Sequence, residues 1–399
     1  MAAPLAGIRV LELTSWMAAP SAAAVLSDLG AQVVKVEPLK GDAARGMGRA
    51  PKNAPGLDAS FHFDNRGKRS IAVAMDRPEG AELVRKLARE CQVLVTNLLP
   101  HRQSRFGLDA PSLFADNPTL VHATLTGYGT TGPEAWRPGY DVTAFFGRGA
   151  VTAASIVPGS EPPAPRPAQG DHAVALALVT AILAALRLVD QTGQGQAVET
   201  SLFHTAAWTM ATDLAPTLVD RYQPKARGRR DGLAALAGRY PCKDDRWIIL
   251  NMPEPHWWPK FCQAIGKAEW TDDERYASPK ARFDNMAALV DALDDVFRTR
   301  TQHEWGEAFD LAGLIWGPAQ QVFELVDDPQ ARAAGFFAPI EAADGTTFDT
   351  VTVPFKIAGT DVLPQGPAPE LGQHTREVLS ELGLPEAEID KLSADQVVA

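Results

Sequence analysis

Apolar and polar positions alternate in a regular order over roughly the first 130 residues. Short apolar runs rich in β-branched residues are separated by amphipathic stretches, the first of which has Pro20 near its start and Gly30 near its end. The strand-type runs occupy residues 8–14, 32–38, 68–75, 91–98 and 119–129, and helical patterns occupy 20–31 and 78–90. This order predicts an α/β fold with a Rossmann-like, open, mostly parallel sheet that binds its ligand at the carboxyl ends of the strands.

The pattern changes after residue 150. A proline-rich stretch, 157–167, leads to Asp171 and then to an apolar run, 174–189, which Arg187 interrupts. We interpret this run as a buried helix, because it is shorter than the ~20 residues that span a bilayer. We predict a large domain at 1–220, a smaller α+β domain at 221–330 and a C-terminal segment at 331–399 that returns to the large domain.

Charge and cysteine content narrow the class of function. The formal net charge is −11 and the chain has no block of Lys or Arg, so we expect no nucleic-acid partner and no membrane binding. The three cysteines are widely spaced, and the histidines form no metal-binding pair, so we expect no metal site. The N-terminus lacks a basic segment followed by an apolar one. These features favour a cytoplasmic enzyme that acts on small molecules.

A dinucleotide-dependent dehydrogenase is one alternative. Glu37 ends the second predicted strand, where an acid that binds ribose would lie. The stretch "TSWMAAPSAAA" nevertheless contains no GxGxxG, so the usual close approach to a pyrophosphate is missing. We therefore do not favour NAD or FAD, and we interpret Glu37 as a solvated residue at a strand end.

Motifs along almost the whole chain resemble those of one enzyme family. They include "GIRVLELT", "NRGKRSIAVAM", "NPTLVHATLTGYGTTGP", "TGQGQAVETSL", "GPAQQVFELVDDPQ" and "PELGQHTREVLSELGL", in this order. The chain resembles the class III coenzyme A transferases, the CaiB/BaiF family, which includes formyl-CoA and carnitine CoA-transferases and α-methylacyl-CoA racemases. The resemblance implies an interlocked homodimer, with acyl-CoA and a carboxylic acid as substrates and no permanently bound cofactor.

Asp171 is the candidate catalytic residue. Its position before an apolar helix favours an N-cap, which needs no catalytic role. The resemblance implies a nucleophile instead, because the family's catalytic aspartate is that of the "GD" here formed by Gly170 and Asp171. Backbone N–H groups of Gly170 and of the first helical turn are candidate donors to an oxyanion. We interpret His172 as a pocket residue, because an ionised carboxylate needs no base.

The remaining site residues are expectations that the resemblance implies. The loop after the first strand would lie beside the pantetheine, and basic or amide side chains would hold the nucleotide and phosphates. Tyr140, in "GYD", stands where the racemases have the histidine of "GHD". The expected CoA- or substrate-binding residues are Ser15, Trp16, Met17, Ala18, Lys68, Asn97, Arg105 and Tyr140.

Two other functions stay open beside CoA transfer. A racemase or epimerase of the same fold needs two bases, and tyrosine, with a reference pKa of ~10, is a weak base at neutral pH. Transfer is therefore favoured over racemisation. A non-catalytic protein that binds CoA esters is the remaining alternative.

Overall fold

The computed structural model describes residues 3–49, 51–52, 56–157, 159–342 and 344–399. The chain divides into two compact units. The large unit comprises Met1–Ala153, Ala164–Tyr222 and Gln330–Ala399, and the small unit comprises Ala154–Pro163 and Gln223–Pro329.

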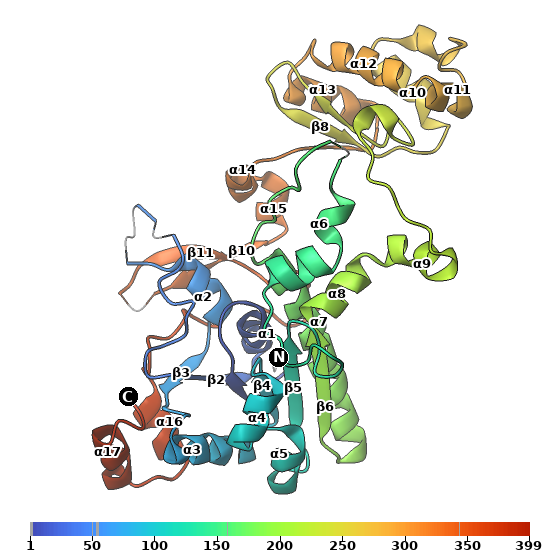
Figure 1. Cartoon of the computed structure of the whole chain (residues 1–399). Helices are drawn as coiled ribbons and strands as arrows, with labels where there is room; N and C mark the ends of the chain where they lie inside the picture. Colours follow the sequence, from blue (N-terminus) through green and yellow to red (C-terminus); the bar gives the residue numbers. More distant parts are fainter. Residues whose placement is uncertain (1–2, 50, 53–55, 158, 343) are drawn as a thin grey trace. The chain divides into compact units, whose positions relative to one another are not determined.

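A six-stranded sheet forms the centre of the large unit (Figure 1). Its order is β3-β2-β1-β4-β5-β6, and every neighbouring pair is parallel. The order reverses between β1 and β4, which places a ligand-binding crevice outside the carboxyl ends of these two strands. The predicted fold class is confirmed. The strands are β1 (Arg9–Leu13), β2 (Gln32–Glu37), β3 (Arg69–Ala72), β4 (Val93–Thr96), β5 (Val121–Thr126) and β6 (Gln196–Ser201).

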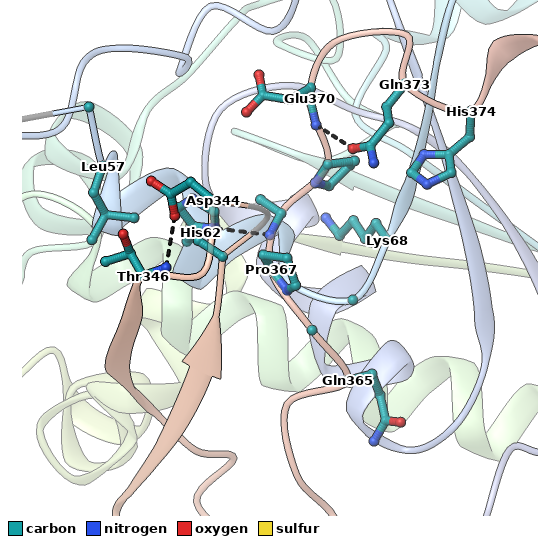
Figure 2. Close-up of a pocket in the computed structure, with 16 residues that line it drawn as sticks. Leu57, His62, Lys68, Asp344, Thr346, Gln365, Pro367, Glu370, Gln373 and His374 are labelled. Carbon is teal, nitrogen blue, oxygen red and sulfur yellow. Dashed lines mark hydrogen bonds between the residues drawn. The ribbon is translucent and has the colours of Figure 1, made fainter. Parts of the chain in front are cut away.

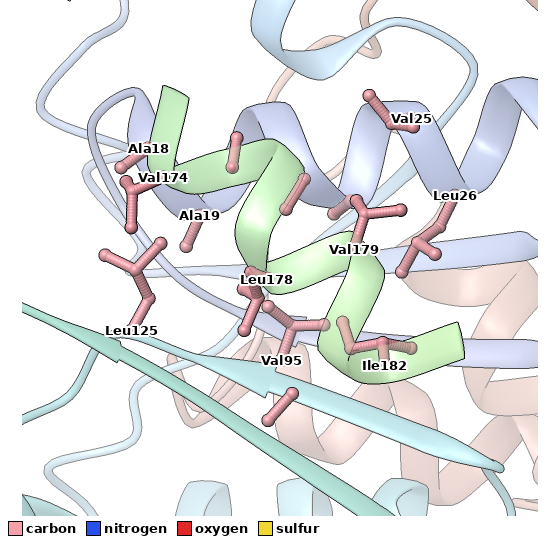
Figure 3. Packing of buried hydrophobic residues seen from close by; sticks show 14 of the residues in the cluster. Ala18, Ala19, Val25, Leu26, Val95, Leu125, Val174, Leu178, Val179 and Ile182 are labelled. Atoms are coloured by element: carbon pink, nitrogen blue, oxygen red, sulfur yellow. The ribbon is translucent and has the colours of Figure 1, made fainter. Parts of the chain in front are cut away.

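Two helices, α1 (Ala18–Asp28) and α7 (Gln169–Thr192), pack together on one face of the sheet. Successive strand residues point to opposite faces, so Val10 of β1 contacts this cluster, whereas Leu11 lies in the core on the other face. Alanines make up much of α1, and small side chains let two helices approach closely. Figure 3 shows the contact, with Ala18 beside Val174 and Leu26 near Val179.

The C-terminal segment completes the other face of the sheet. Its last residues follow β3, where the Ala399 N–H donates to the Ala72 carbonyl at 3.1 Å. Val73 and Val398 form an antiparallel bridge. The helices of this core include α3 (Pro78–Arg89), α5 (Ala110–Asp116), α16 (Thr375–Glu381) and α17 (Glu386–Ala394).

Shorter elements complete both units. The large unit also contains the antiparallel pair β10 (Phe337–Glu341) and β11 (Thr347–Val351), a π-helix (Val142–Arg148), α2 (Ala59–Asn65), α4 (Pro100–Phe106), α8 (Leu202–Thr209) and α9 (Ala211–Asp220). Two helices lie at the boundaries between the units, α6 (Val151–Ala154) and α15 (Pro329–Ala333). The small unit consists of the antiparallel sheet β7 (Arg239–Pro241), β8 (Trp247–Leu250) and β9 (Trp316–Pro318), with α10 (Trp257–Ala264), α11 (Pro279–Asp284), α12 (Met286–Phe297), α13 (Gln302–Leu311), α14 (Val322–Asp327) and two 3-10 turns, Arg229–Asp231 and Ala268–Thr271.

α7 is longer than its apolar run predicts. It has 24 residues, and by length and composition it is apolar enough to cross a membrane. Core helices of water-soluble proteins meet the same criterion, and here the inner side of α7 packs on α1 and the sheet. The apolar run covers only part of the helix, because the helix begins before the run, at polar or small residues that include Gly170 and Asp171, and ends after it at Thr192.

Candidate active site

Asp171 is the third residue of α7, so it is not the N-cap that its position in the sequence favours. The N-cap is Ala168, which has a φ of +73°, and no side chain in the described chain caps this end. The first backbone N–H groups of a helix have no acceptor within the helix, and the helix dipole is positive there. The Asp171 carboxylate therefore lies near backbone N–H groups that have no intrahelical acceptor, and it does not itself serve as the N-cap.

Gly170 brings a second carboxylate to this turn. A Cβ added to Gly170 would lie 2.7 Å from Cγ of Phe145 and 3.0 Å from Cβ of Asp141. Only glycine allows the π-helix to pack this closely on α7. Asp141 is 3% exposed, and its Oδ2 has no hydrogen-bond partner within the described part of the chain.

The pKa of Asp171 is raised to about 7, mainly by burial, with smaller contributions from the negative charges of Asp141 and then Asp64. The charge of His172 opposes these effects. A carboxyl group normally has a pKa near 4, so it is fully ionised at neutral pH. Here the carboxylate is less stabilised by solvent, which is the condition of a reactive nucleophile.

His172 points from α7 toward α2. Its Nε2 lies 3.2 Å from Oδ1 of Asp64, and its ring packs edge-on against Phe63 at a centroid distance of 5.0 Å. The same Asp64 oxygen accepts a hydrogen bond from Ser21 Oγ at 2.5 Å. His172 therefore orients the first turn of α7 against α1 and α2.

The expected CoA loop lies between β1 and α1. Ser15 donates its N–H to Asn97 Oδ1 at 3.2 Å and accepts from Asn97 Nδ2 at 2.8 Å. Met17 is the N-cap of α1, and Ala18 is its first residue. The structure thus brings together Ser15, Trp16, Met17, Ala18 and Asn97, at the carboxyl ends of β1 and β4.

Trp16 has a left-handed backbone with a φ of +72°. This conformation costs an ordinary residue about 1–2 kcal/mol. Its indole packs edge-on against Tyr140, with ring centroids 5.2 Å apart, and Tyr140 is 52% exposed. Tyr140 directly precedes Asp141, so this aromatic pair adjoins the carboxylates.

The N-termini of α1 and α7 lie at the same end of the helix pair. Figure 3 shows Ala18 beside Val174 at one end and Leu26 near Val179 further along, so the two helices run in the same general direction. Two positive helix ends therefore converge where Asp171 and the Ser15–Ala18 loop lie, an arrangement that favours bound negative charge.

Lys68 has a different place from the expected one. Its side chain is fully buried, and its Nζ donates to the Pro20 and Asp64 carbonyls at 2.9 Å and pairs with Glu12 Oε2 at 2.8 Å. Burial lowers the pKa of Lys68 to about 8. The geometry does not support a contact between this ammonium and a CoA phosphate, because its donors already have acceptors inside the protein.

Arg105 is exposed, unlike Lys68, whereas Glu37 is buried against expectation. Arg105 is exposed on α4, with its guanidinium 5.6 Å from the Phe106 ring centroid, which leaves its charge accessible to an anion. Glu37 is 1% exposed, so the interpretation of a solvated strand end is wrong. Its carboxylate binds Arg45 through two hydrogen bonds of 2.7 and 2.6 Å, and it accepts from Ser70 Oγ at 2.6 Å.

A cavity of about 670 Å³ lies beside β3 and the C-terminal segment (Figure 2), and Asp171 is not among the residues that line it. His62 Nδ1 accepts the Ala368 N–H at 2.9 Å, and His374 Nδ1 accepts the Ser70 N–H at 3.2 Å. Burial lowers the pKa of both histidines, which keeps these rings neutral and able to accept. These contacts anchor the C-terminal segment.

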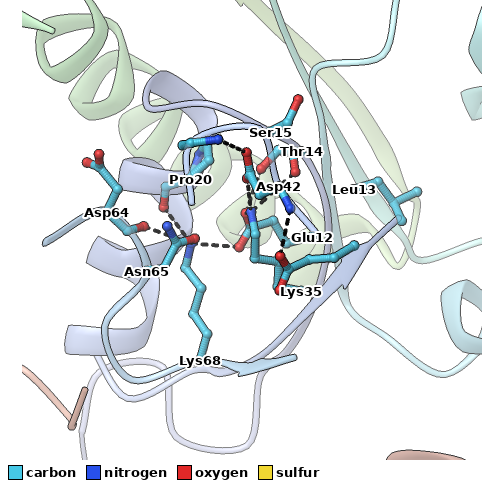
Figure 4. A network of polar contacts seen from close by, with 12 residues as sticks. Glu12, Leu13, Thr14, Ser15, Pro20, Lys35, Asp42, Asp64, Asn65 and Lys68 are labelled. Carbon is cyan, nitrogen blue, oxygen red and sulfur yellow. Dashed lines mark hydrogen bonds and ion pairs between the residues drawn. The ribbon is translucent and has the colours of Figure 1, made fainter. Parts of the chain in front are cut away.

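Sequence reasoning missed a group of buried charges below the CoA loop (Figure 4). Glu12 of β1 and Lys35 of β2 are register partners in adjacent strands, and both are 0% exposed. The sequence does contain a signal for this ion pair, because an acidic and a basic residue each interrupt an apolar strand pattern and the two strands are predicted neighbours. Two further site residues were not predicted: Asp141, which is the third residue of "GYD", and Asp64, which has no motif signal of its own.

Asp171→Asn is expected to stabilise the fold at pH 8. The folded pKa is raised, so ionisation disfavours the folded state from pH 4 upward, and the cost is complete above pH 7. For a partly exposed group we expect a gain of about 2 kcal/mol, which vanishes near pH 4. Urea unfolding at both pH values measures it. Asp213→Asn, an exposed first-turn position of α9, is the control. Lower stability of Asp171→Asn at pH 8 would contradict the raised pKa.

The chain is similar to known proteins over almost its whole length. A family model described as CoA-transferase family III matches residues 5–375. The chain is 34% identical, over 99% of both chains, to (R)-2-hydroxy-4-methylpentanoate CoA-transferase of Clostridioides difficile. It is 32% identical to succinate–glutarate CoA-transferase of Agrobacterium fabrum, over 95% of this chain and 96% of the relative. A crystal structure of a CaiB/BaiF family protein from Brucella suis superposes with a TM-score of 0.86 at 31% identity, covering 96% of this chain and 100% of that chain.

Proposed function

Because this chain belongs to CoA-transferase family III, we propose that it moves CoA from an acyl-CoA to a free carboxylic acid, with Asp171 as the nucleophile. The observation that carries the proposal is the place of Asp171. Its carboxylate lies in the first turn of α7, partly buried beside Asp141, where two helix N-termini converge. The class of enzyme follows from the family, and the route through Asp171 is our proposal.

The proposed reaction conserves the activated acyl bond through four exchanges. The Asp171 carboxylate attacks the thioester carbonyl, which forms a mixed anhydride and releases the CoA thiolate. The thiolate attacks the Asp171 carbonyl, which gives an aspartyl-CoA thioester and frees the donor acid. The acceptor carboxylate then attacks this thioester and forms a second anhydride with release of the thiolate. Attack of the thiolate on the acceptor carbonyl yields the new acyl-CoA and restores Asp171.

Each tetrahedral intermediate carries an oxyanion. We propose that backbone N–H groups in the first turn of α7, including that of Gly170, donate to it, because they have no intrahelical acceptor. Fixed donors of this kind need little reorganisation when charge develops. The convergent dipoles of α1 and α7 support the same charge.

CoA would lie along the carboxyl ends of β1 and β4. We propose that the Ser15–Ala18 loop contacts the pantetheine, that Asn97 fixes this loop, and that Arg105 meets a phosphate. A guanidinium suits phosphate because it can donate two parallel hydrogen bonds. Tyr140 would contact the acyl group. We propose no contact between Lys68 and CoA, because its ammonium donates to carbonyl oxygens inside the protein and stabilises the fold there.

A transfer assay tests the function. The protein is incubated with acetyl-CoA or succinyl-CoA and a panel of acids that includes 2-hydroxy-4-methylpentanoate, glutarate and succinate, and new acyl-CoAs are identified by mass spectrometry. Hydroxylamine traps the activated aspartate, and peptide mapping is expected to place the adduct on Asp171. Deuterium wash-in at the α-carbon without exchange of acids would instead identify a racemase. If neither transfer nor wash-in is observed, a non-catalytic protein that binds CoA esters is the remaining alternative.

We also propose a homodimer located in the cytoplasm. The three cysteines are free and buried, as suits a reducing compartment. Helices α7, α8 and α9 expose large apolar side chains that a second copy of the chain would cover. These side chains are Leu176, Leu183, Leu188, Trp208, Leu218 and Val219.

Dilution to nanomolar concentration is expected to leave the dimer intact. If the exposed apolar side chains of α7 are buried only in the dimer, a separate monomer has little stability. Size-exclusion chromatography with light scattering measures the mass, and the paired change Leu183→Arg and Leu218→Arg is expected to reduce folded dimer. The matched change Phe283→Arg, at an exposed apolar position of α11, is the control. A folded, compact monomer at nanomolar concentration would overturn the dimer.

A further inference from the structure

The backbone of Trp16 is held from outside its own loop. A bulky residue does not take a φ of +72° without external contacts, and the Trp16 N–H donates to Asp42 Oδ1 at 3.0 Å. Two further backbone contacts fix the preceding residues, from Asn97 to Ser15 and from Lys35 Nζ to the Thr14 carbonyl at 3.2 Å. Strain that persists under several converging contacts points to a conformation needed for function.

Asp42 is itself held by the interior of the protein. Its Oδ2 lies 2.8 Å from Lys35 Nζ, and the same ammonium lies 2.9 Å from Glu12 Oε1. All three side chains are 0% exposed (Figure 4). Glu12 and Lys35 are neighbours across β1 and β2, so the ion network rests on the rigid centre of the sheet. Because Glu12 and Lys35 are on strands of the sheet, they position Asp42 more precisely than loop residues could.

The network extends to the first turn of α7. Lys68 pairs with Glu12 at 2.8 Å and donates to the Asp64 carbonyl, and Asp64 Oδ1 meets Nε2 of His172, the neighbour of Asp171. The same buried charges thus fix the Trp16 loop and the nucleophile's turn. Replacing one buried partner leaves the other charge uncompensated, so the arrangement tolerates little displacement.

We propose that Asp42 and Lys35 are positioning residues that hold Trp16 against Tyr140, and that Trp16 makes this transferase prefer acids with a bulky apolar side chain. The proposal rests on the proposed function. Trp16 follows β1 at the switch point of the sheet, where the ligand crevice lies, and Tyr140 adjoins Asp141 beside the nucleophile. Two aromatic rings at this point offer apolar surface to a branched or aromatic acyl group, and a short acyl group leaves that surface in water.

Degenerate exchange tests the preference with one acid at a time. Deuterated 4-methylpentanoate is incubated with 4-methylpentanoyl-CoA, and deuterated acetate with acetyl-CoA, and label in the CoA ester is followed by mass spectrometry. We expect kcat/KM to favour 4-methylpentanoyl at least tenfold. Trp16→Gly keeps the left-handed backbone without strain and removes only the indole, so it is expected to lower this ratio at least tenfold. An unchanged ratio in Trp16→Gly overturns the role of Trp16.

A double-mutant cycle separates positioning from general stability. Asp42→Asn is expected to lower the ratio several-fold in the native chain and to leave it unchanged in the Trp16→Gly background, because the ring that it positions is absent. A structural role alone would lower exchange of both acids equally in both backgrounds. That equal loss would overturn the positioning role of Asp42.

Fluorine NMR of protein labelled with 5-fluorotryptophan gives a readout without turnover. The Trp16 signal is identified by its loss in Trp16→Gly. Asp42→Asn and Lys35→Met are expected to shift or broaden this signal. The control Asp294→Asn alters the ion pair with Arg229 at 2.7 Å in the small unit and is expected to leave the signal in place. An unmoved signal in either folded network variant overturns the proposal. If the native protein exchanges neither acid and hydroxylamine labels no aspartate, the proposed function fails. The NMR result still tests whether Asp42 and Lys35 position Trp16, because it does not depend on turnover.

Discussion

Asp171→Asn is expected to reduce CoA transfer by at least about a thousandfold and to abolish the hydroxylamine-sensitive adduct. An asparagine amide is a poor nucleophile and cannot form the anhydride. The substitution preserves size and leaves the N-cap untouched, since that position is Ala168. Initial rates measured with saturating acyl-CoA and acid give the effect. CoA affinity, measured by calorimetry, should change little, because the proposed phosphate contact is on α4.

Asp213→Asn serves as the matched control for this substitution. It removes a carboxylate from the first turn of another helix, at an exposed position, and full activity is expected. Oxygen transfer gives an independent check. The mechanism moves one oxygen of the acceptor acid into the Asp171 carboxylate, so ¹⁸O-labelled acid should label that residue in a single turnover. Rapid transfer by Asp171→Asn would exclude Asp171 as the nucleophile.

The second large effect is a rise of kcat/KM with pH through about 7. Asp171 attacks only when ionised, and burial together with Asp141 raises its pKa to about 7. Below that value the ionised fraction falls, so each pH unit costs about tenfold in rate. The profile is measured between pH 5 and pH 9 with a substrate acid that stays ionised throughout.

Asp141→Asn is expected to move the acid limb of this profile to lower pH. The change removes the negative charge beside Asp171, which lowers the pKa of the nucleophile and makes the variant several-fold more active than the native protein at pH 5.5, relative to each protein's plateau. Asp213→Asn should leave the profile unchanged. An unmoved acid limb in Asp141→Asn would show that Asp141 does not control the ionisation of the nucleophile.

Local patterns determined the parallel half of the fold because its elements alternate along the chain. The predicted runs at 8–14, 32–38 and 119–129 contain β1, β2 and β5, and the helix predicted at 78–90 is α3. β6 was not predicted. It is an edge strand, whose alternating half-buried residues in "QAVETS" resemble a loop until β5 lies beside them.

The sequence by itself determined the family and the α/β class, because motifs in fixed order and the period of apolar residues are properties of the chain alone. It did not determine the surroundings of Asp171. Asp141, Asp64 and His172 come from three elements, and their effect on one carboxylate depends on distances that only packing sets. The same holds for Lys68, which the motif suggests for phosphate and the fold buries beside Glu12. Charge and burial act through space, so tertiary structure decided which groups face the nucleophile and which serve the interior.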